Sequence, residues 1–217
     1  MNFEQARFNM IEQQIRPWDV LDQSVLDLLF SVRREEFVPA AMQRLAFADA
    51  EIPLGHGAVM LAPKIEAHAV QAVQVKKHES VLEIGTGSGY MAALLAAHAA
   101  HVTTLEIVPE LADAARANLK RAQVDNVTVE TANGASGLSA KAPFDVIVVS
   151  ASVPAVPQEL LAQLKVGGRL FAIVGLEPVM EAQVITREGE SAFSTETLFE
   201  TVTAPLAALA PVQKFTF

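Results

Sequence analysis

Cysteine is absent from this chain of 217 residues, which excludes disulfides, thiolate metal ligands and a cysteine nucleophile. No apolar run reaches the roughly 18 residues that a membrane-spanning helix needs. The first residues lack the basic start and apolar core of a signal peptide. We therefore expect a cytoplasmic protein that is not inserted in a membrane.

Basic residues are also scarce, with 16 Lys and Arg against 25 Asp and Glu and a net charge of −9. Proteins that bind the nucleic-acid backbone normally present a basic surface, so we expect no nucleic-acid partner. A protein, peptide or small-molecule substrate remains compatible with this charge. The histidines have no metal-ligand spacing with acids, so we expect no metal site.

The pattern along the chain divides it into two parts of one predicted domain, residues 1–217. Residues 1–75 read as helical and loop-rich. Residues 76–217 alternate strands with helices, which predicts an α/β fold with a mostly parallel sheet and helices on both faces. Seven strands are predicted, and the last two are expected to form an antiparallel edge. They cover 80–85, 101–107, 126–132, 144–151, 168–175, 180–187 and 193–203, with helices near 89–99, 109–123 and 156–164.

The stretch "LEIGTGSG" (82–89) joins the first of these strands to its helix. Its glycines permit a tight turn and a close backbone approach to a ligand. Glu106 ends the next strand, about 20 residues after the first glycine, where a carboxylate can accept hydrogen bonds from both ribose hydroxyls. The sequence therefore predicts a cofactor that contains ribose. The alternative is that the glycines only form a turn and Glu106 is a surface acid.

The identity of that cofactor follows from what the loop does not contain. Tyr90 stands where a dinucleotide-binding loop has its last glycine, and no Gly-Lys-Ser/Thr phosphate loop is present. Glu83 would disfavour a pyrophosphate but suits a cationic ligand. S-adenosylmethionine carries a sulfonium, an ammonium and a ribose without phosphate, so the pattern favours it over NAD.

With these residues in place, the chain resembles the protein-L-isoaspartate O-methyltransferases over nearly its whole length. The resemblance implies a Rossmann-like methyltransferase fold with extra N-terminal helices. It also implies that S-adenosyl-L-methionine is the methyl donor and S-adenosyl-L-homocysteine the product. The expected activity is carboxyl methylation of damaged aspartyl residues, the first step of their repair. The stretches that carry the resemblance are "VRREEFVP" (32–39), "IPLGHG" (52–57), "VLEIGTGSGY" (81–90), "APFDVIVVSASVP" (142–154) and "LKVGGRLFAIVG" (164–175).

A carboxylate acceptor is already ionised at neutral pH, so its methylation requires alignment and exclusion of water more than acid–base catalysis. We therefore expect few catalytic side chains. The predicted cofactor-binding residues are Glu83, Gly85, Thr86, Gly87, Gly89, Glu106, Ile107, Asn133 and Gly134.

Two stretches depart from the family pattern. The family's G-Q-T-x-S-x-P, which holds the substrate carboxylate, reads Gly57 to Pro63 here as "GAVMLAP", with Leu61 in place of the serine. The family's G-D-G reads Ala132-Asn133-Gly134, and the Asn133 side-chain oxygen can still accept a hydrogen bond. Each lost hydrogen bond to a charged group is worth roughly 1.5–3 kcal/mol, so slower isoaspartate methylation is expected.

Three residues are candidates for the acceptor site: Leu61, His56 and Ser152. His56 could act as a general base for an alcohol or amine, and Ser152 could replace the missing hydroxyl. For both, a structural role in a loop or turn is the competing interpretation. Two functional alternatives also stay open: a methyltransferase for an apolar small molecule, and a cofactor-binding module without catalysis.

Overall fold

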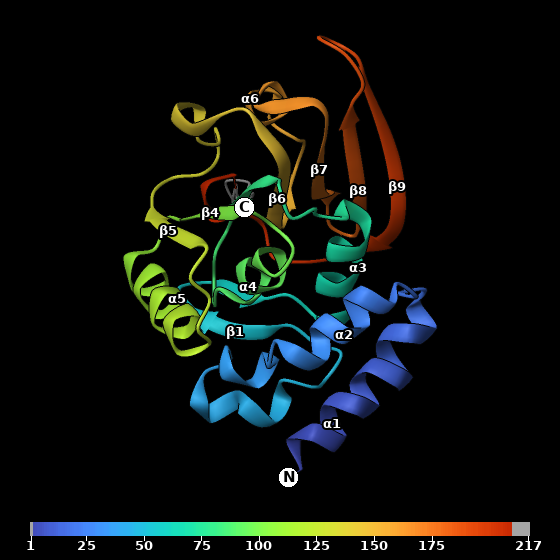
Figure 1. The fold of residues 1–217 in the computed structure, drawn as a ribbon, viewed down its shortest axis with the longest axis vertical. Coiled ribbons are helices and arrows are strands. Elements are labelled where there is room, and N and C mark those ends of the chain that lie inside the picture. Colours follow the sequence, from blue (N-terminus) through green and yellow to red (C-terminus); the bar gives the residue numbers. More distant parts are fainter. Residues whose placement is uncertain (1, 210–217) are drawn as a thin grey trace, which may run out of the picture.

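The computed structural model describes residues 2–209 and contains two sheets with helices packed around the larger one (Figure 1). The strands are β1 (Ile52–Gly55), β2 (Ala58–Met60), β3 (Ser80–Ile84), β4 (His101–Glu106), β5 (Val127–Thr131), β6 (Phe144–Val153), β7 (Leu164–Leu176), β8 (Val179–Arg187) and β9 (Phe193–Thr201). The α-helices are α1 (Phe3–Met10), α2 (Gln23–Ser31), α3 (Pro63–Val73), α4 (Tyr90–Ala96), α5 (Pro109–Arg121) and α6 (Gln158–Ala162). A π-helical turn (Ile11–Ile15) and short 3-10 turns (Arg16–Trp18, Arg34–Glu36, Ala40–Leu45, Ser139–Lys141, Ala207–Leu209) complete the regular elements of this part.

The larger sheet orders its strands β5-β4-β3-β6-β7-β8-β9. β3 to β7 pair in parallel, whereas β8 and β9 are antiparallel additions at one edge. The predicted seven-stranded Rossmann-like sheet with an antiparallel edge is therefore confirmed. The strand order reverses between β3 and β6, and in such sheets ligands bind beyond the carboxyl ends of the strands at this point.

Alternate side chains of the central strands belong to two separate cores. Val81 and Val146 lie in one cluster with α3, α4 and the N-terminal helices. Leu82 and Ile147 lie in the other with Leu160 of α6. The period of two along each strand thus places helices on both faces, as predicted.

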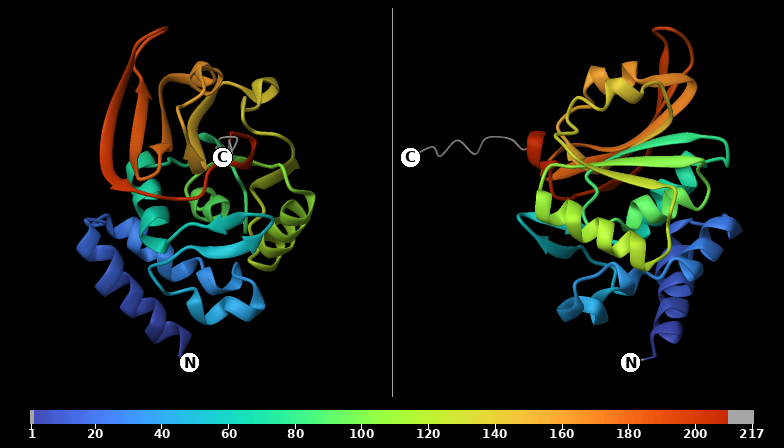
Figure 2. Two further views of the ribbon diagram at one scale, coloured as in Figure 1. Left: turned by 180° about the vertical axis from the view of Figure 1, so that it is seen from behind. Right: turned by 60° about the vertical axis from the view of Figure 1, so that its left-hand side comes forward.

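The N-terminal region packs on the first of these faces. Ile11 and Ile15 of the π-helical turn are fully buried and share a core with Leu26 of α2 and Val73 of α3. Figures 1 and 2 show α1 and α2 at one end of the molecule, with α6 and the tip of β8–β9 at the other. Among residues 2–209, no helix is both long and apolar enough to cross a membrane.

Within the part expected to be helical and loop-rich, residues 52–60 form an antiparallel hairpin of β1 and β2. Its turn consists of Gly55, His56 and Gly57, with φ of 90°, 54° and 75°. Glycine adopts this left-handed region without steric cost, and histidine tolerates it as a single residue. The glycines therefore reverse the chain and direct β2 back toward α3.

After β9 the chain returns across the molecule as residues 203–209, here called the C-terminal strap. The backbone N–H of Ser152 in β6 donates to Ala204 O over 3.0 Å, and Leu206 N–H donates to Ser152 O over 2.8 Å. The Thr203 hydroxyl donates to the Glu51 carboxylate next to β1. These bonds hold the strap between β6 and the hairpin.

Candidate functional site

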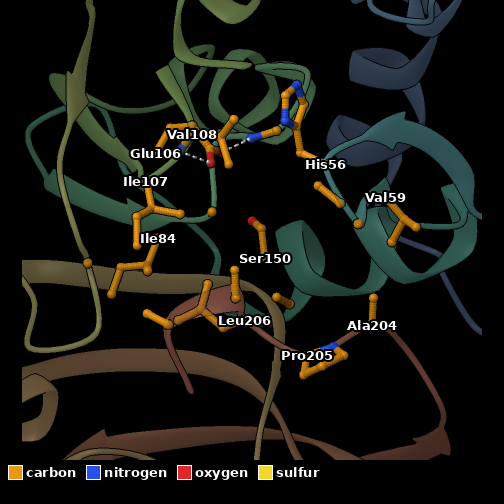
Figure 3. A pocket seen from close by; sticks show the side chains of 18 of the residues that line it. His56, Val59, Ile84, Glu106, Ile107, Val108, Ser150, Ala204, Pro205 and Leu206 are labelled. Atoms are coloured by element: carbon orange, nitrogen blue, oxygen red, sulfur yellow. Dashed lines mark hydrogen bonds between the residues drawn. The ribbon is translucent and has the colours of Figure 1, made fainter. Parts of the chain in front are cut away.

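A cavity opens at the carboxyl ends of β3, β4 and β6, where the sheet order reverses (Figure 3). The hairpin turn closes one side and the C-terminal strap closes another. We call this cavity the main pocket. Its lining includes Ile84, Gly85, Gly87, Leu105, Glu106, Ile107, Gly134 and Ser150 of the sheet half, His56 to Val59 of the hairpin, and Ala204 to Ala208 of the strap.

Glu106 lies at the end of β4 and faces the main pocket, and only 6% of its surface is exposed. Its Oε2 accepts the Gly87 N–H over 2.9 Å, and its Oε1 accepts the Val108 N–H over 3.0 Å (Figure 3). Each carboxylate oxygen has a second lone pair. Glu106 therefore holds the glycine loop in place and can still accept two hydroxyl protons from a ligand.

Apolar side chains line the pocket beside Glu106. Ile84 and Leu105 come from the sheet, while Ile107 is 41% exposed although it is a large hydrophobic residue. Leu206 of the strap approaches from the other side, within 3.5 Å of the position that a Cβ on Gly85 would take. In Figure 3, Ile107 and Ile84 lie at the left of the cavity and Leu206 lies below them. The surface suits a flat, weakly polar ring next to a sugar.

The three predicted glycines of the 82–89 loop have different surroundings. Gly85 and Gly87 line the main pocket. Gly89 does not line it: a Cβ on Gly89 would lie 3.3 Å from the side chains of Ala115 and Leu119 in α5. Gly89 is also the N-cap residue of α4, with a φ of 84°. Gly89 therefore allows α4 and α5 to pack closely.

Glu83 is fully buried beneath the glycine loop. Its Oε2 accepts the Thr104 hydroxyl over 2.6 Å and its Oε1 accepts the Ser150 hydroxyl over 2.8 Å. Burial raises the pKa of Glu83 to about 8, despite the lowering effect of these two hydrogen bonds. Thr86 is buried as well, with its hydroxyl 2.6 Å from that of Thr104.

The segment after β5 brings only one of its two predicted residues to the main pocket. Gly134 lines it, and a Cβ there would lie 2.6 Å from Ile84 Cγ2, so no other residue fits without a shift. Asn133 is exposed, and its Oδ1 accepts the Ala135 N–H over 3.0 Å. Asn133 thus lies on the surface, outside the lining of the main pocket, and its side chain stabilises a local turn.

The three acceptor-site candidates also separate. His56 lies in the hairpin turn and lines the main pocket (Figure 3). Leu61 is buried behind it, 3% exposed. Ser152 is buried in β6 and donates its hydroxyl to Thr203 O over 3.0 Å, away from the pocket lining. It holds the strap and caps no helix, whereas Ser150, two residues earlier, is the serine that reaches the pocket.

Sequence reasoning missed two parts of the site. The strap follows the last strand without any motif, so no local signal marks it as a pocket wall. Arg34 and Glu66 form a buried ion pair of 3.0 Å behind the hairpin. The only available signal was a charged residue inside the apolar pattern of "PKIEAHAV" (63–70).

Comparison with known proteins shows which family the chain belongs to. Residues 5–210 match the family model described as protein-L-isoaspartate(D-aspartate) O-methyltransferase. The chain belongs to this family. Protein-L-isoaspartate O-methyltransferases from Methanoculleus marisnigri and Rhodopseudomonas palustris are 42% and 43% identical to it. The first comparison covers 84% of both chains and the second 91% of both.

Solved structures carry the same fold. A structure described as a putative protein-L-isoaspartate O-methyltransferase from Plasmodium falciparum, in complex with S-adenosyl-L-homocysteine, superposes with a TM-score of 0.80. The superposition covers 95% of this chain and 98% of that one at 21% identity, so it supports the fold alone. The family assignment confirms the predicted S-adenosylmethionine-dependent O-methyltransferase. It does not favour a small-molecule acceptor or a non-catalytic module.

Proposed function

We propose that this protein methylates the free carboxylate of isoaspartyl residues in proteins or peptides, with the main pocket holding the methyl donor. The observation that carries the proposal is the family match over residues 5–210, together with a pocket in which Glu106 presents two oxygens beside an apolar surface. We also propose that residues 1–217 act as one domain in the cytoplasm. A core shared between the N-terminal helices and the sheet supports the first point, and the cysteine-free sequence supports the second.

The residues of the main pocket fit S-adenosylmethionine. Glu106 would accept the ribose hydroxyls, and Ile84, Ile107 and Leu206 would enclose the adenine. Gly85 and Gly87 leave room for the chain that joins the ribose to the sulfur. The bound donor supplies a methyl group on a positively charged sulfur.

The protein's own contribution is alignment of that methyl group with a carboxylate oxygen and exclusion of water. The hairpin and the strap border the pocket and would provide the exclusion. At the family's substrate-holding positions the hairpin presents Ala58 and Val59, which lack hydrogen-bonding side chains. We propose that backbone groups of the hairpin hold the acceptor, so the acceptor should bind less tightly than in members with the polar side chains.

Mass spectrometry of a peptide pair tests the proposal. The two peptides share one sequence and differ only in an isoaspartyl or an aspartyl linkage. With S-adenosylmethionine and the protein, the isoaspartyl peptide should gain the mass of one methyl group as a base-labile ester, and the aspartyl peptide should not. Equal modification of both, or of neither, would contradict the proposed function.

A further inference from the structure

The main pocket continues inward, behind the hairpin, into a small recess. The two cavities share Val59, Gly85, Gly87 and Ser150 in their linings. The recess is otherwise lined by Met60, Leu61, Glu66, Glu83, Thr86, Ser88 and Met91. We call it the inner recess. Two of its residues, Glu66 and Glu83, are buried acids that come from different elements, the first turn of α3 and the strand β3.

Glu66 is held on one side only. Its Oε2 accepts Arg34 Nη1 over 3.0 Å, and its carboxyl has no other hydrogen bond within residues 2–209. Each guanidinium nitrogen of Arg34 donates a hydrogen bond, since Nε also donates to Ala46 O over 3.0 Å and Nη2 donates to Leu61 O over 2.6 Å. One oxygen of Glu66 therefore remains available on the side of the inner recess.

The charges around the inner recess do not balance. Two carboxyl groups face it, and Arg34 is the cation that pairs with one of them. Burial raises the pKa of Glu66 to about 7, although Arg34 lowers it, and burial raises the pKa of Glu83 to about 8. Both acids therefore hold protons in place of a second cation over part of the neutral range. A compact ammonium group would complete the balance.

The protein has a second buried ion pair, which lies away from both cavities. Glu35 pairs with Arg7 in the same N-terminal half, and both side chains are 7% exposed. Neither residue lines the main pocket or the inner recess. Glu35 thus serves as an internal reference for a buried acid with a structural role.

We propose that Glu66 is a further ligand-binding residue, which with Glu83 receives the ammonium group of the methyl donor's methionine part in the inner recess. The inference rests on the proposed function, because it places the ribose of the same ligand at Glu106. The two ends of the ligand would then be fixed by acids of the two cavities that share Gly85 and Gly87. Glu66 would act by binding and would take no part in proton transfer to the acceptor.

Calorimetric titration with two nucleosides tests the assignment. S-adenosylhomocysteine carries the amino-acid part, and methylthioadenosine lacks it. Glu66→Gln should weaken S-adenosylhomocysteine binding by about tenfold or more, because a hydrogen bond to a charged group is worth roughly 1.5–3 kcal/mol. Methylthioadenosine binding should change by less than about twofold. Glu35→Gln, the matched control, should leave the ratio of the two affinities unchanged.

An unchanged affinity ratio in Glu66→Gln would overturn the assignment. If neither nucleoside binds the wild-type protein, the proposed function itself fails and this inference fails with it. If Glu66→Gln does not fold, the wild-type affinity ratio measured from about pH 6 to about pH 8 decides. It should shift several-fold toward S-adenosylhomocysteine as the acids ionise, and a flat ratio would overturn the assignment.

The pH-dependent measurement has to account for the charged and titratable groups that face Glu66 from the elements packed against it. They are Arg34 beside it, Glu83 across the inner recess, and the buried Tyr90 of α4 under the Arg34 guanidinium, with Glu106, Arg7 and Glu35 farther away. Burial raises the pKa of Tyr90 far above neutral, so Tyr90 does not titrate in this range. Glu106 and His56 face the main pocket, which both nucleosides enter, so their effect on binding is common to the two nucleosides and cancels in the ratio.

Discussion

The cofactor side of the main pocket and the hairpin opposite it both have well-defined glycine turns, but their side chains differ in polarity. On the cofactor side, the Glu106 carboxylate accepts hydrogen bonds from the Gly87 and Val108 N–H groups. Its remaining lone pairs can accept hydrogen bonds from a ligand in the pocket. On the hairpin side, the turn geometry of Gly55 to Gly57 is present, but β2 presents alanine and valine. Backbone shape and side-chain chemistry can therefore change independently within one site.

The largest effect is expected on the cofactor side. Glu106→Ala removes two hydrogen bonds from ribose to a charged acceptor, together about 3–6 kcal/mol, so binding of S-adenosylhomocysteine should weaken by at least about a hundredfold. Titration calorimetry measures this. Glu110→Ala, a change of an exposed acid in the first turn of α5, is the control and should bind normally. A change of less than about threefold in Glu106→Ala would mean that the ribose lies elsewhere.

On the hairpin side, adding a hydrogen-bonding side chain tests the same comparison. Val59→Thr keeps the side-chain shape at a half-buried position of the pocket wall and supplies a hydroxyl. One hydrogen bond to a carboxylate should raise kcat/KM for an isoaspartyl peptide by about tenfold, with the S-adenosylhomocysteine Kd within about twofold. Val59→Ala, which adds no hydroxyl, should not raise kcat/KM. Equal gains in both variants would point to steric relief instead.

A substitution in the C-terminal strap should weaken ligand binding to a smaller extent, through loss of an apolar contact. Leu206→Ala should weaken methylthioadenosine binding by about threefold to tenfold, because a partly buried leucine loses part of its contact with the adenosine. The control is Val202→Ala, which changes a side chain that is 47% exposed and outside the pocket lining. Identical binding in Leu206→Ala and the wild type would show that the strap does not touch the ligand.

The buried acids predict a shallow pH dependence of stability. The folded-state pKa values of Glu66 and Glu83, about 7 and about 8, lie above the ordinary glutamate value of 4.5. A raised folded pKa of an acid stabilises the fold below its unfolded pKa, and this stability is lost as pH rises through the folded value. The Tm of the ligand-free protein should therefore fall from about pH 6.5 to about pH 8.5.

The variant Glu83→Gln tests whether the buried acids cause this decrease of Tm with pH. The variant should have a flatter Tm profile over the same range, because one of the two raised groups no longer titrates. The pKa of His68 is lowered by burial, so its contribution is lost as pH falls, below this window. A Tm that rises with pH in the wild type would contradict ionisable acids in the inner recess.

The sheet could be predicted from the sequence because each strand and helix has its own local period. The Pro109 start of α5 and its Lys120-Arg121 end follow the expected capping and dipole preferences. Glu106 could be predicted because its distance from the glycine loop follows from one helix and one strand. Its contacts with Gly87 and Val108 required the structure.

Contacts between distant segments were beyond sequence reasoning. Gly89 belongs to the glycine motif, yet its neighbours are in α5, because sequence spacing does not show which face of a turn a helix will cover. Ser152 is a candidate from the sequence, but its hydroxyl donates to Thr203 O, whereas the Ser150 hydroxyl donates to Glu83. Residues two apart on a regular strand share a face, and the register of β6 shifts between Val148 and Ser152, which no sequence pattern indicates. The hairpin could not be predicted within the helical and loop-rich part, because its strands are only three or four residues long.

The most direct test of this account measures both sides of the pocket in one preparation: the Kd for S-adenosylhomocysteine and the methylation rate of an isoaspartyl peptide against its aspartyl twin. The account predicts clear cofactor binding that depends on Glu106, methylation of the isoaspartyl peptide alone, and a rate that Val59→Thr increases. Cofactor binding without methylation of the isoaspartyl peptide, in the wild type and in Val59→Thr, would contradict it.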